Sequence, residues 1–344
     1  MNQEKEQIFS STGSAGVTRR PYDRIYGNAT RFSSSFDEVG RNVRRVSSIV
    51  ENHPQISRGV LRGVVSEEVV EAVAGTEFEH LLEVAVPLQE FSQENAYLVY
   101  FAQNSASRQQ LTSTEQMISA TESDVMRSNP LERVRSVVES GLHFSDSIQE
   151  DQVDQLHSLW GPTFGWERHE VDALRRRLDG SRTTDPSDRD VWFSAVHDNG
   201  TIVSAAMAER LSIPGSEGDL HLVENTEWRT RDEYAGRGLM TATLAMLNSR
   251  ILSDFRHGGN GLPLIYAECN FQSRSDRAGA GAGLIVPSRE RAPQIIVQNV
   301  LVNDGQDVPE GSLRDFTFMY MPRDVIESFY DPVQVDTMLR MTRS

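Results

Sequence analysis

Lysine and cysteine are nearly absent from the 344 residues, with Lys5 and Cys269 as the single member of each type. One cysteine cannot form an intramolecular disulfide. Without a further lysine the chain has no P-loop, whose pattern requires one, and no plausible lysine for a Schiff base. Cys269 lies in "LIYAECNF", and we expect it to be a small buried residue, because no local Cys/His/Asn arrangement accompanies it.

Long apolar runs are missing as well. No window approaches 18 consecutive apolar residues, so we expect no membrane span. The opening stretch "MNQEKEQIFSSTGSAG" has no apolar segment of the kind found in a secretory signal. The eight histidines show no His-Glu-x-x-His or similar spacing, so no metal site is predicted. A cytoplasmic protein is the default expectation.

Positive charge is in short supply, since 50 acidic residues outweigh 34 basic ones and give a net charge of -16. This balance argues against a general binder of nucleic acid or anionic membrane. It weakly favours a cationic small-molecule partner. Apolar residues make up 38% of the chain, below the typical fraction, so we expect part of it to be poorly packed.

The first third of the chain gives the fewest signals. Residues 1–36 are rich in Ser, Arg, Gly and Asn and are expected to be a flexible N-terminal segment. Residues 37–130 are predicted to be a mainly helical region of unknown role. Its last part, Gln103 to Pro130, is polar and is predicted to be a linker or an exposed helix. "FDEVGRNVRRVSSIV" and "VSEEVVEAVAG" have helical periodicity, whereas "HLLEVAVPL" and "AYLVYFA" are either strands or buried helix pieces.

Regular signals begin near Val134 and continue to about residue 330, with residues 331–344 left as a C-terminal tail. The elements follow the order β-α-α-β-β-β-α-β-α-β-β, which predicts an α+β (mixed α/β) fold. They are "LHFSDSI", the helices "QEDQVDQLHSLWG" and "ERHEVDALRRRLDG", the hairpin "VWFSAVHDNGTIVSAAMAERLSI", "DLHLVENTEWRT", a long helix after Gly238, "LPLIYAECN", a glycine-containing helix, "QIIVQNVLVND" and "RDFTFMYMP".

Two glycines stand where that long helix begins, in "TRDEYAGRGLMTATLAMLNSRIL". A helix N-terminus has unpaired N–H groups and a dipole that favours an anion. Gly236 and Gly238 carry no Cβ, so a phosphate can approach those N–H groups closely. A pyrophosphate-bearing cofactor fits this junction. A dinucleotide is disfavoured, because the third glycine of its fingerprint is missing.

The stretch "EYAGRGLMTATL" resembles the acetyl-CoA pyrophosphate loop of the Gcn5-related N-acetyltransferase (GNAT) superfamily. Gly236, Arg237, Gly238 and Leu239 match the family pattern, whereas Ala235 replaces the usual Arg or Gln and Met240 the usual Gly or Ala. The resemblance covers about residues 134–323. It implies a central mixed sheet flanked by helices, with acetyl-CoA as cofactor.

The same resemblance assigns further cofactor contacts. The strand before the loop pairs with the pantetheine arm, here through Trp228, Arg229 and Thr230. The helix after the next strand often begins with an Asn, matched by Asn270. The backbone N–H groups of the turn, as far as Met240, are expected to bind the pyrophosphate. The arginines that could also meet the phosphates are Arg231, Arg237, Arg274 and Arg277.

Acyl transfer to an amine requires a base that accepts a proton and a donor for the leaving thiolate. Candidates for the base are Glu224, Glu227 and Glu268. Strand alternation places Glu224, Thr226 and Trp228 on one face, and a bulge would shift that parity. The family's acid is a tyrosine on the following helix, which this chain lacks. Tyr266, Ser273 and Ser275 are the substitutes.

The acceptor site of the family lies beside the first two helices, where this chain has "HSLWGPTFGWERHE". Trp160, Phe164 and Trp166 could line an acceptor pocket, with His169 nearby, or they form the core of a helix hairpin. The sequence therefore predicts an acetyl-CoA-dependent N-acyltransferase for a small-molecule or protein amine. The alternative is a catalytically inactive binding module, suggested by Ala235 and the missing tyrosine. The oligomeric state is not predicted, and a dimer is possible.

Overall fold

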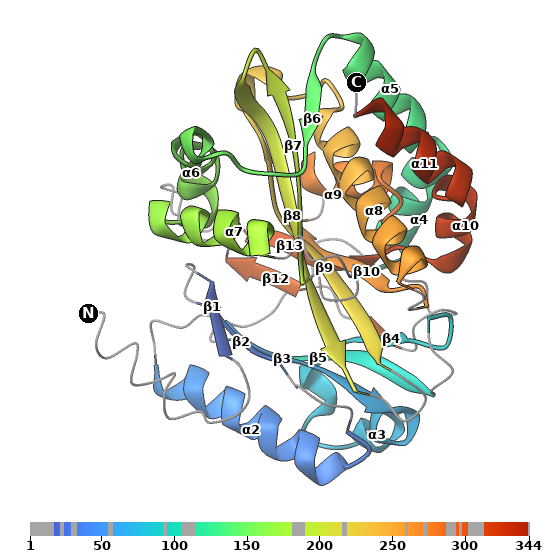
Figure 1. The fold of residues 1–344 in the computed structure, drawn as a ribbon. Helices are drawn as coiled ribbons and strands as arrows, with labels where there is room; N and C mark the ends of the chain where they lie inside the picture. The colour runs from blue at the N-terminus through green and yellow to red at the C-terminus, as the bar shows by residue number, and fades with distance from the viewer. Residues whose placement is uncertain are drawn as a thin grey trace.

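The computed structural model describes most of the chain: residues 17–20, 24–28, 33–53, 58–91, 95–104, 114–180, 190–214, 219–258, 261–270, 274–286, 294–295, 298–301 and 313–342. Two sheets dominate the molecule, and helices cover both of them (Figure 1). Within the described part of the chain, no helix combines the length and apolar character that crossing a membrane would require.

The larger sheet has seven strands in the order β12-β13-β10-β9-β8-β7-β6. Its neighbours pair antiparallel except β9 and β10, which are parallel. The strands are β6 (His143–Ser145), β7 (Val191–Asp198), β8 (Thr201–Ile213), β9 (Leu220–Thr230), β10 (Leu264–Asn270), β12 (Gln298–Leu301) and β13 (Leu313–Tyr320). A mixed sheet of this kind, flanked by helices, is the predicted fold. The predicted strands occur in the predicted order with one exception: "QIIVQNVLVND", expected to be one strand, contains β12 of this sheet and β11 (Gln294–Ile295) of the smaller sheet.

Helices lie on both faces of this sheet (Figure 1). On one face α8 (Leu239–His257) packs on the strands and contacts α5 (Pro130–Glu139), α9 (Arg274–Gly281) and α11 (Pro332–Met341). Because these helices surround it, α8 is buried along almost its whole length. The other face is covered by α6 (Val153–Phe164) and α7 (Arg168–Gly180), which follow the short helix η2 (Glu150–Gln152).

The smaller sheet has six strands in the order β1-β2-β3-β5-β4-β11. They are β1 (Val17–Arg20), β2 (Arg24–Asn28), β3 (Arg58–Ser66), β4 (Leu82–Pro87), β5 (Ala96–Asn104) and β11 (Gln294–Ile295). One face packs on α2 (Phe36–Asn52) and α3 (Glu67–Val73), with η1 (Glu79–Leu81) beside them. Its other face shares a core with the seven-stranded sheet, in which Val60, Val64 and Tyr100 meet Tyr266 and Phe318.

The N-terminal extension is therefore not mainly helical, and this part of the prediction was wrong. The two ambiguous segments, "HLLEVAVPL" and "AYLVYFA", are strands. A third strand, β3, is buried at every position, because α2 covers one face and the seven-stranded sheet the other. A strand buried on both sides has no apolar-polar alternation, so periodicity does not reveal it. The segment expected to be flexible contains β1 and β2, and its residues 1–16, 21–23 and 29–32 lie outside the described part.

Two further segments differ from expectation. The polar linker contains α4 (Thr114–Met126), in which Met117 and Thr121 are buried and which packs on α9. The expected C-terminal tail, residues 331–344, contains α11, and α10 (Arg323–Phe329) precedes it. Asp331 caps α11 by accepting from the N–H groups of Val333 and Gln334, and Pro332 occupies its first turn. These are local start signals that the sequence prediction missed.

Candidate functional site

The two parallel strands at the centre of the large sheet separate partway along their length. β10 pairs with β9 from Leu264↔Leu222 to Tyr266↔Glu224. Beyond that point β9 continues to Thr230 and β10 to Asn270, with no further pairing between them among the described residues. The part of β9 after Glu224 therefore presents an edge toward β10 at which a ligand's amide groups could pair as a strand would.

A bulge in β9 lies within this separated part. The register with β8 shifts between Ala205 and Met207, whose partners are Arg229 and Thr226. Glu227, between those partners, has a positive φ of 50°, which is uncommon for a residue with a Cβ. The bulge inserts one residue and reverses the alternation that follows it.

The faces of β9 therefore differ from simple alternation. Thr226 and Arg229 share a face, because their partners Met207 and Ala205 belong to the core beneath α6 and α7. Glu224 lies on the same face, two residues before Thr226. Trp228 packs instead on the core around α8. The expectation that Glu224, Thr226 and Trp228 share a face was wrong for Trp228. The extra residue at Glu227 reverses the alternation, so the side chain of Trp228 lies on the opposite face of the sheet.

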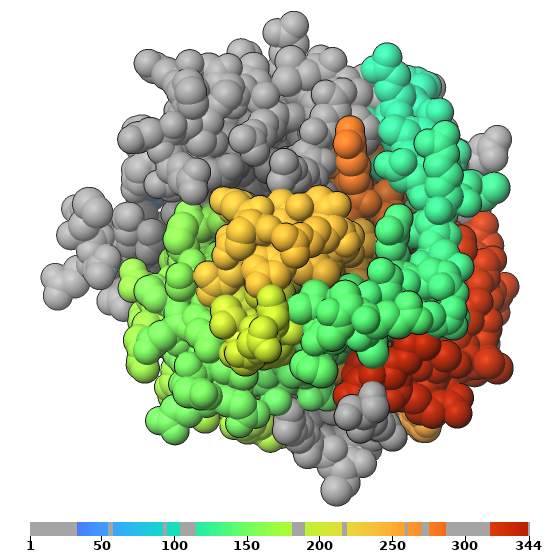
Figure 2. Space-filling model, turned by 90° about the horizontal axis from the view of Figure 1, so that it is seen from above, coloured from blue at the N-terminus to red at the C-terminus, as the bar shows by residue number. Residues whose placement is uncertain are grey.

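The glycine turn follows β9 through the short helix η4 (Asp232–Tyr234). Gly236 and Gly238 have φ of 79° and 76°, in the left-handed region that glycine adopts without strain. Gly238 is the N-cap of α8, and no side chain caps this N-terminus. Figure 2 shows the start of α8 at the surface in gold, next to the green of α5. The first N–H groups of α8 are therefore available to an anion.

The predicted phosphate-binding arginines differ in the contacts that their guanidinium groups already make. Arg237 lies over the ring of Tyr234 at 5.0 Å and is exposed. Arg231 donates from Nε to the carbonyl of Ile202 at 2.7 Å. Since Arg237 has an exposed head next to the turn, it is better placed than Arg231 to meet a phosphate. Arg229, predicted to contact the pantetheine arm, pairs with Asp232 at 3.0 Å.

A further arginine at the turn escaped the sequence prediction. A Cβ on Gly238 would lie 3.7 Å from both Cδ and Nη1 of Arg133, an exposed residue of α5. No local pattern connects Arg133 with the glycine turn, because about a hundred residues separate them in sequence. Arg133 thus adds a cation to the surface around the start of α8.

The remaining predicted contacts on the cofactor side are only partly described. Arg277 is exposed on α9. Asn270 ends β10 and Arg274 begins α9, but their side chains lie outside the described residues, as does the whole of Ser273. Ser275 is half-buried in the first turn of α9.

Three of the predicted catalytic residues lie on one face of the sheet at the point of separation. Glu224 and Tyr266 are register partners on β9 and β10, and Glu268 follows on the same face of β10. Arg62 of β3 donates from Nη1 to Oε2 of Glu224 at 2.5 Å, with side chains only 10% and 8% exposed. The smaller sheet thus reaches the candidate site, which the sequence did not predict.

Tyr266 lies inside an aromatic cluster rather than in the cleft. Its ring stacks on Phe318 at 5.4 Å and meets Tyr100 edge-on at 6.5 Å. Burial raises the pKa of Tyr266, although the guanidinium of Arg62 acts in the opposite direction. Because Tyr266 is 3% exposed, its hydroxyl has no open path to a leaving group in this structure.

Buried polar contacts join β9 to the helices behind it. Asn225 donates to Asn248 of α8 at 2.8 Å, and Asn248 donates to the carbonyl of Ala282 at 3.4 Å. Ser204 bonds the hydroxyls of both Thr230 and Thr243 at 2.9 Å. These contacts fix the last part of β9 and the first turns of α8 relative to each other.

The aromatic residues proposed for the acceptor pocket belong mainly to the core of the helix pair. Trp160 is fully buried and packs edge-on against Trp166 at 5.2 Å and Phe193 at 6.1 Å. It therefore does not line a pocket. Phe164 and Trp166 are half-buried against the same cluster, and His169 is exposed on α7.

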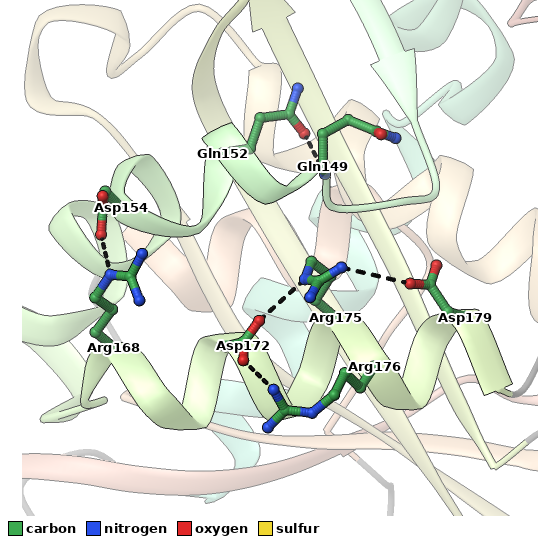
Figure 3. Close-up of polar contacts among 8 residues, drawn as sticks. All are labelled: Gln149, Gln152, Asp154, Arg168, Asp172, Arg175, Arg176 and Asp179. Atoms are coloured by element: carbon green, nitrogen blue, oxygen red, sulfur yellow. Dashed lines mark hydrogen bonds and ion pairs between the residues drawn. The ribbon is translucent and has the colours of Figure 1, made fainter.

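Ion pairs fix the outer side of this helix pair, as Figure 3 shows. Arg168 of α7 contacts Asp154 of α6 at 2.5 Å. Within α7, Asp172 pairs with both Arg175 and Arg176, and Arg175 also approaches Asp179. Gln152 accepts from the N–H of Gln149 at 3.0 Å at the start of η2. These contacts lie at or near the surface and explain why α7 carries so many charged residues.

Cys269 is buried at 3% exposure, and burial raises the pKa of its thiol. This agrees with the prediction of a small buried residue. In the described ranges, no group of three or more His, Cys, Asp or Glu could hold a metal ion.

Comparisons with known proteins found no family model and no curated protein that matches the sequence. Solved structures of similar fold include a putative GNAT-family acetyltransferase from Desulfovibrio desulfuricans, at 13% identity over 53% of this chain and 98% of that chain, with a TM-score of 0.33. The PaiA N-acetyltransferase from Thermoplasma acidophilum in complex with coenzyme A has 12% identity over 53% of this chain and 98% of that chain, with a TM-score of 0.32. The spermidine N-acetyltransferase from Vibrio cholerae in complex with coenzyme A and spermine has 15% identity over 54% of this chain and 97% of that chain, with a TM-score of 0.34. At these scores the similarity supports no conclusion about activity.

Proposed function

We propose that this chain is an acetyl-CoA-dependent N-acyltransferase that transfers an acetyl group to a primary amine. One observation carries the proposal: β9 and β10 separate after Glu224, and β9 then leads into a turn with two positive-φ glycines that begins α8. A strand edge followed by an uncapped helix N-terminus fits a ligand with an amide-containing arm and a pyrophosphate.

The residues present fit coenzyme A. The backbone N–H groups from Gly236 to Met240 would hold the pyrophosphate, with Arg237 and Arg133 as nearby cations. The edge of β9 at 228–230 would pair with the pantetheine arm. When bound, acetyl-CoA supplies an activated acetyl thioester, so the protein has to position the amine and move protons.

Among the residues that the structure describes, the site offers candidate bases but no evident acid. An attacking amine must lose a proton, and a carboxylate within hydrogen-bond reach, or one water away, can accept it. Glu227 at the bulge and Glu268 on β10 are both half-buried, so solvent can carry the proton away. Glu224 is bound by Arg62, and we assign it an electrostatic role toward the acceptor.

The acceptor is proposed to be cationic, because the net charge of -16 attracts a protonated amine by long-range electrostatics. A small amine and a protein amine both remain compatible with this charge.

Calorimetric titration of the full chain with acetyl-CoA, with NADH as control, tests the cofactor. Thiol release from acetyl-CoA with a panel of spermidine, kanamycin, lysine and a peptide with a free N-terminus tests the transfer. We expect binding of acetyl-CoA and not of NADH, and thiol release with at least one amine. No binding at millimolar acetyl-CoA would contradict the proposal.

A second candidate function is a binding module without catalysis. The observations that favour it are Ala235 in place of a phosphate-contacting side chain and Tyr266 buried away from the cleft. Such a module binds coenzyme A but releases no thiol with any amine of the panel, so the two measurements distinguish the candidates.

A further inference from the structure

The smaller sheet presents two buried arginines on the face that it turns toward the larger sheet. Arg58 and Arg62 lie four residues apart on β3, on the same side as Val60 and Val64, which belong to the core shared by both sheets. A buried guanidinium is costly unless a carboxylate pairs with it. Each of these arginines has such a partner.

The partners lie in different places. Arg58 binds Glu83 of β4 through Nη1 and Nη2, at 3.1 and 2.9 Å, within its own sheet. Arg62 binds Glu224 across the boundary between the sheets, at 2.5 Å. The first pair contributes to the smaller sheet alone, whereas the second fixes a residue of β9 at the point where β9 and β10 separate.

We propose that Arg62 is a positioning residue of the acyl-transfer site, which holds the carboxylate of Glu224 in place and charged, so that the two sheets form the site together. This inference rests on the proposed function. The inference extends that function by assigning a side chain of the site to the N-terminal part of the chain.

The groups around the pair support this role. Tyr100 of β5 and Tyr266 and Glu268 of β10 face the same guanidinium. Burial on its own lowers the pKa of Arg62, but the carboxylate of Glu224 and the other groups outweigh burial and leave it above its usual value. Arg62 is thus a permanent cation. A buried carboxylate next to a permanent cation stays ionised, whereas without that cation its pKa rises.

The rest of the geometry agrees. Thr226, the next residue on this face of β9, is buried, and its hydroxyl has no hydrogen-bond partner among the described residues. The face that Arg62 and Glu224 share with Thr226 therefore still offers a polar atom to a ligand beside the bulge.

The test compares Arg62→Met and Arg62→Lys with the matched control Arg58→Met, which removes another buried, carboxylate-paired arginine from the same strand. For each full-length variant we would measure the thermal midpoint, acetyl-CoA binding by calorimetry, and the pH profile of kcat with the panel amine of fastest turnover. The expected result for Arg62→Met is a fall of about tenfold or more in kcat with acetyl-CoA binding unchanged. The acid limb of its kcat profile should move to higher pH. Arg62→Lys should restore most of the turnover.

The control should lower the thermal midpoint without moving the pH profile. Equal losses of kcat in Arg62→Met and Arg58→Met, with identical pH profiles, would overturn the role of Arg62 while leaving the proposed function intact. A wild-type chain that binds acetyl-CoA but releases no thiol would instead remove the proposed function, and this inference with it. If Arg62→Met does not fold, the comparison of Arg62→Lys with Arg58→Lys decides by the same criteria.

Discussion

At the scale of single residues, the glycines of the turn before α8 are the clearest case in which backbone conformation dictates residue type. Both Gly236 and Gly238 have φ near 80°, and no atom lies within 4 Å of where a Cβ on Gly236 would be. An alanine at either position therefore meets backbone strain and little steric conflict. The strain is on the order of 1 kcal/mol for a left-handed residue with a Cβ.

We predict that Gly238→Ala lowers the free energy of unfolding by about 1 kcal/mol and weakens acetyl-CoA binding, because relaxing the strain moves the first N–H groups of α8. Denaturant unfolding and calorimetry would measure the two effects. Gly75→Ala is the matched control, since Gly75 has a φ of 74°, no neighbour within 4 Å, and a place in the smaller sheet's helical layer. The interpretation fails if both variants bind acetyl-CoA as the wild type does.

The sequence indicated this turn because its signal is local, with glycines just before an apolar-periodic run. It did not indicate Arg62 or Arg133, which reach the site from segments far away in the chain. It also assigned Trp228 to the wrong face of β9, because the bulge at Glu227 depends on pairing with β8 and on the positive φ of one residue. Contacts and bulges of this kind are tertiary properties, which no single segment encodes.

At the scale of elements, β9 carries a titratable residue near its start. His221 is half-buried, and Arg210 of β8 lies 2.9 Å from its Nδ1. Burial and the charge of Arg210 lower the pKa of His221 to about 4, against a weaker opposing effect of Asp219. In the unfolded chain the histidine titrates near 6.5.

Because the unfolded state binds this proton first, we predict that His221 causes the free energy of unfolding to fall as the pH drops from about 6.5 to about 4. His197, whose pKa burial also lowers, contributes in the same direction. His221→Gln should flatten the pH dependence of the thermal midpoint across this range. The variant His169→Gln, at an exposed position of α7, serves as a control for the loss of a histidine elsewhere in the molecule. An unchanged slope in His221→Gln would contradict the assignment.

The crossing of α8 and α9 depends on a glycine for a steric reason. A Cβ on Gly281 would lie 2.8 Å from Cγ2 and 2.9 Å from Oγ1 of Thr241. We predict that Gly281→Ala lowers the free energy of unfolding by roughly 1–3 kcal/mol through overpacking. Thr241→Ala should relieve most of this cost, so a double-mutant cycle by denaturant unfolding should show coupling of about 0.5 kcal/mol or more. Additive effects would place the strain elsewhere.

The elements from about residue 134 onward were predicted well, because their strands are bounded by turn residues and their helices end in glycine. The turn of the β7–β8 hairpin at Asn199 and Gly200, both with positive φ, is an example. The strands of the smaller sheet were not predicted well. β3, for example, is buried on both sides, so its sequence lacks the apolar-polar alternation of a half-exposed strand. Burial on both faces hides a strand from any argument based on amphipathicity.

At the scale of the whole molecule, the smaller sheet is part of the main core rather than an appended unit. Its residues Val60 and Tyr100 pack in one cluster with Tyr266, Phe318 and the residues around α8. The pair between Arg62 and Glu224 crosses the same boundary. A boundary that is apolar and holds a buried ion pair differs from the polar, solvated interface typical of domains that move independently.

We therefore predict that the chain unfolds in one cooperative transition and that a fragment starting at residue 114 does not fold alone. Removing residues 1–113 would expose the aromatic cluster of Tyr266 and Phe318 and leave Glu224 without its guanidinium. Differential scanning calorimetry of the full chain should show a single peak whose calorimetric and van't Hoff enthalpies agree. The fragment should lack a cooperative transition and bind no acetyl-CoA, although it retains every residue of the glycine turn. Two separate peaks, or a fragment that binds acetyl-CoA with the affinity of the full chain, would show that the smaller sheet is an independent domain. Either result would contradict the proposal that the two sheets form the site together and that Arg62 belongs to it.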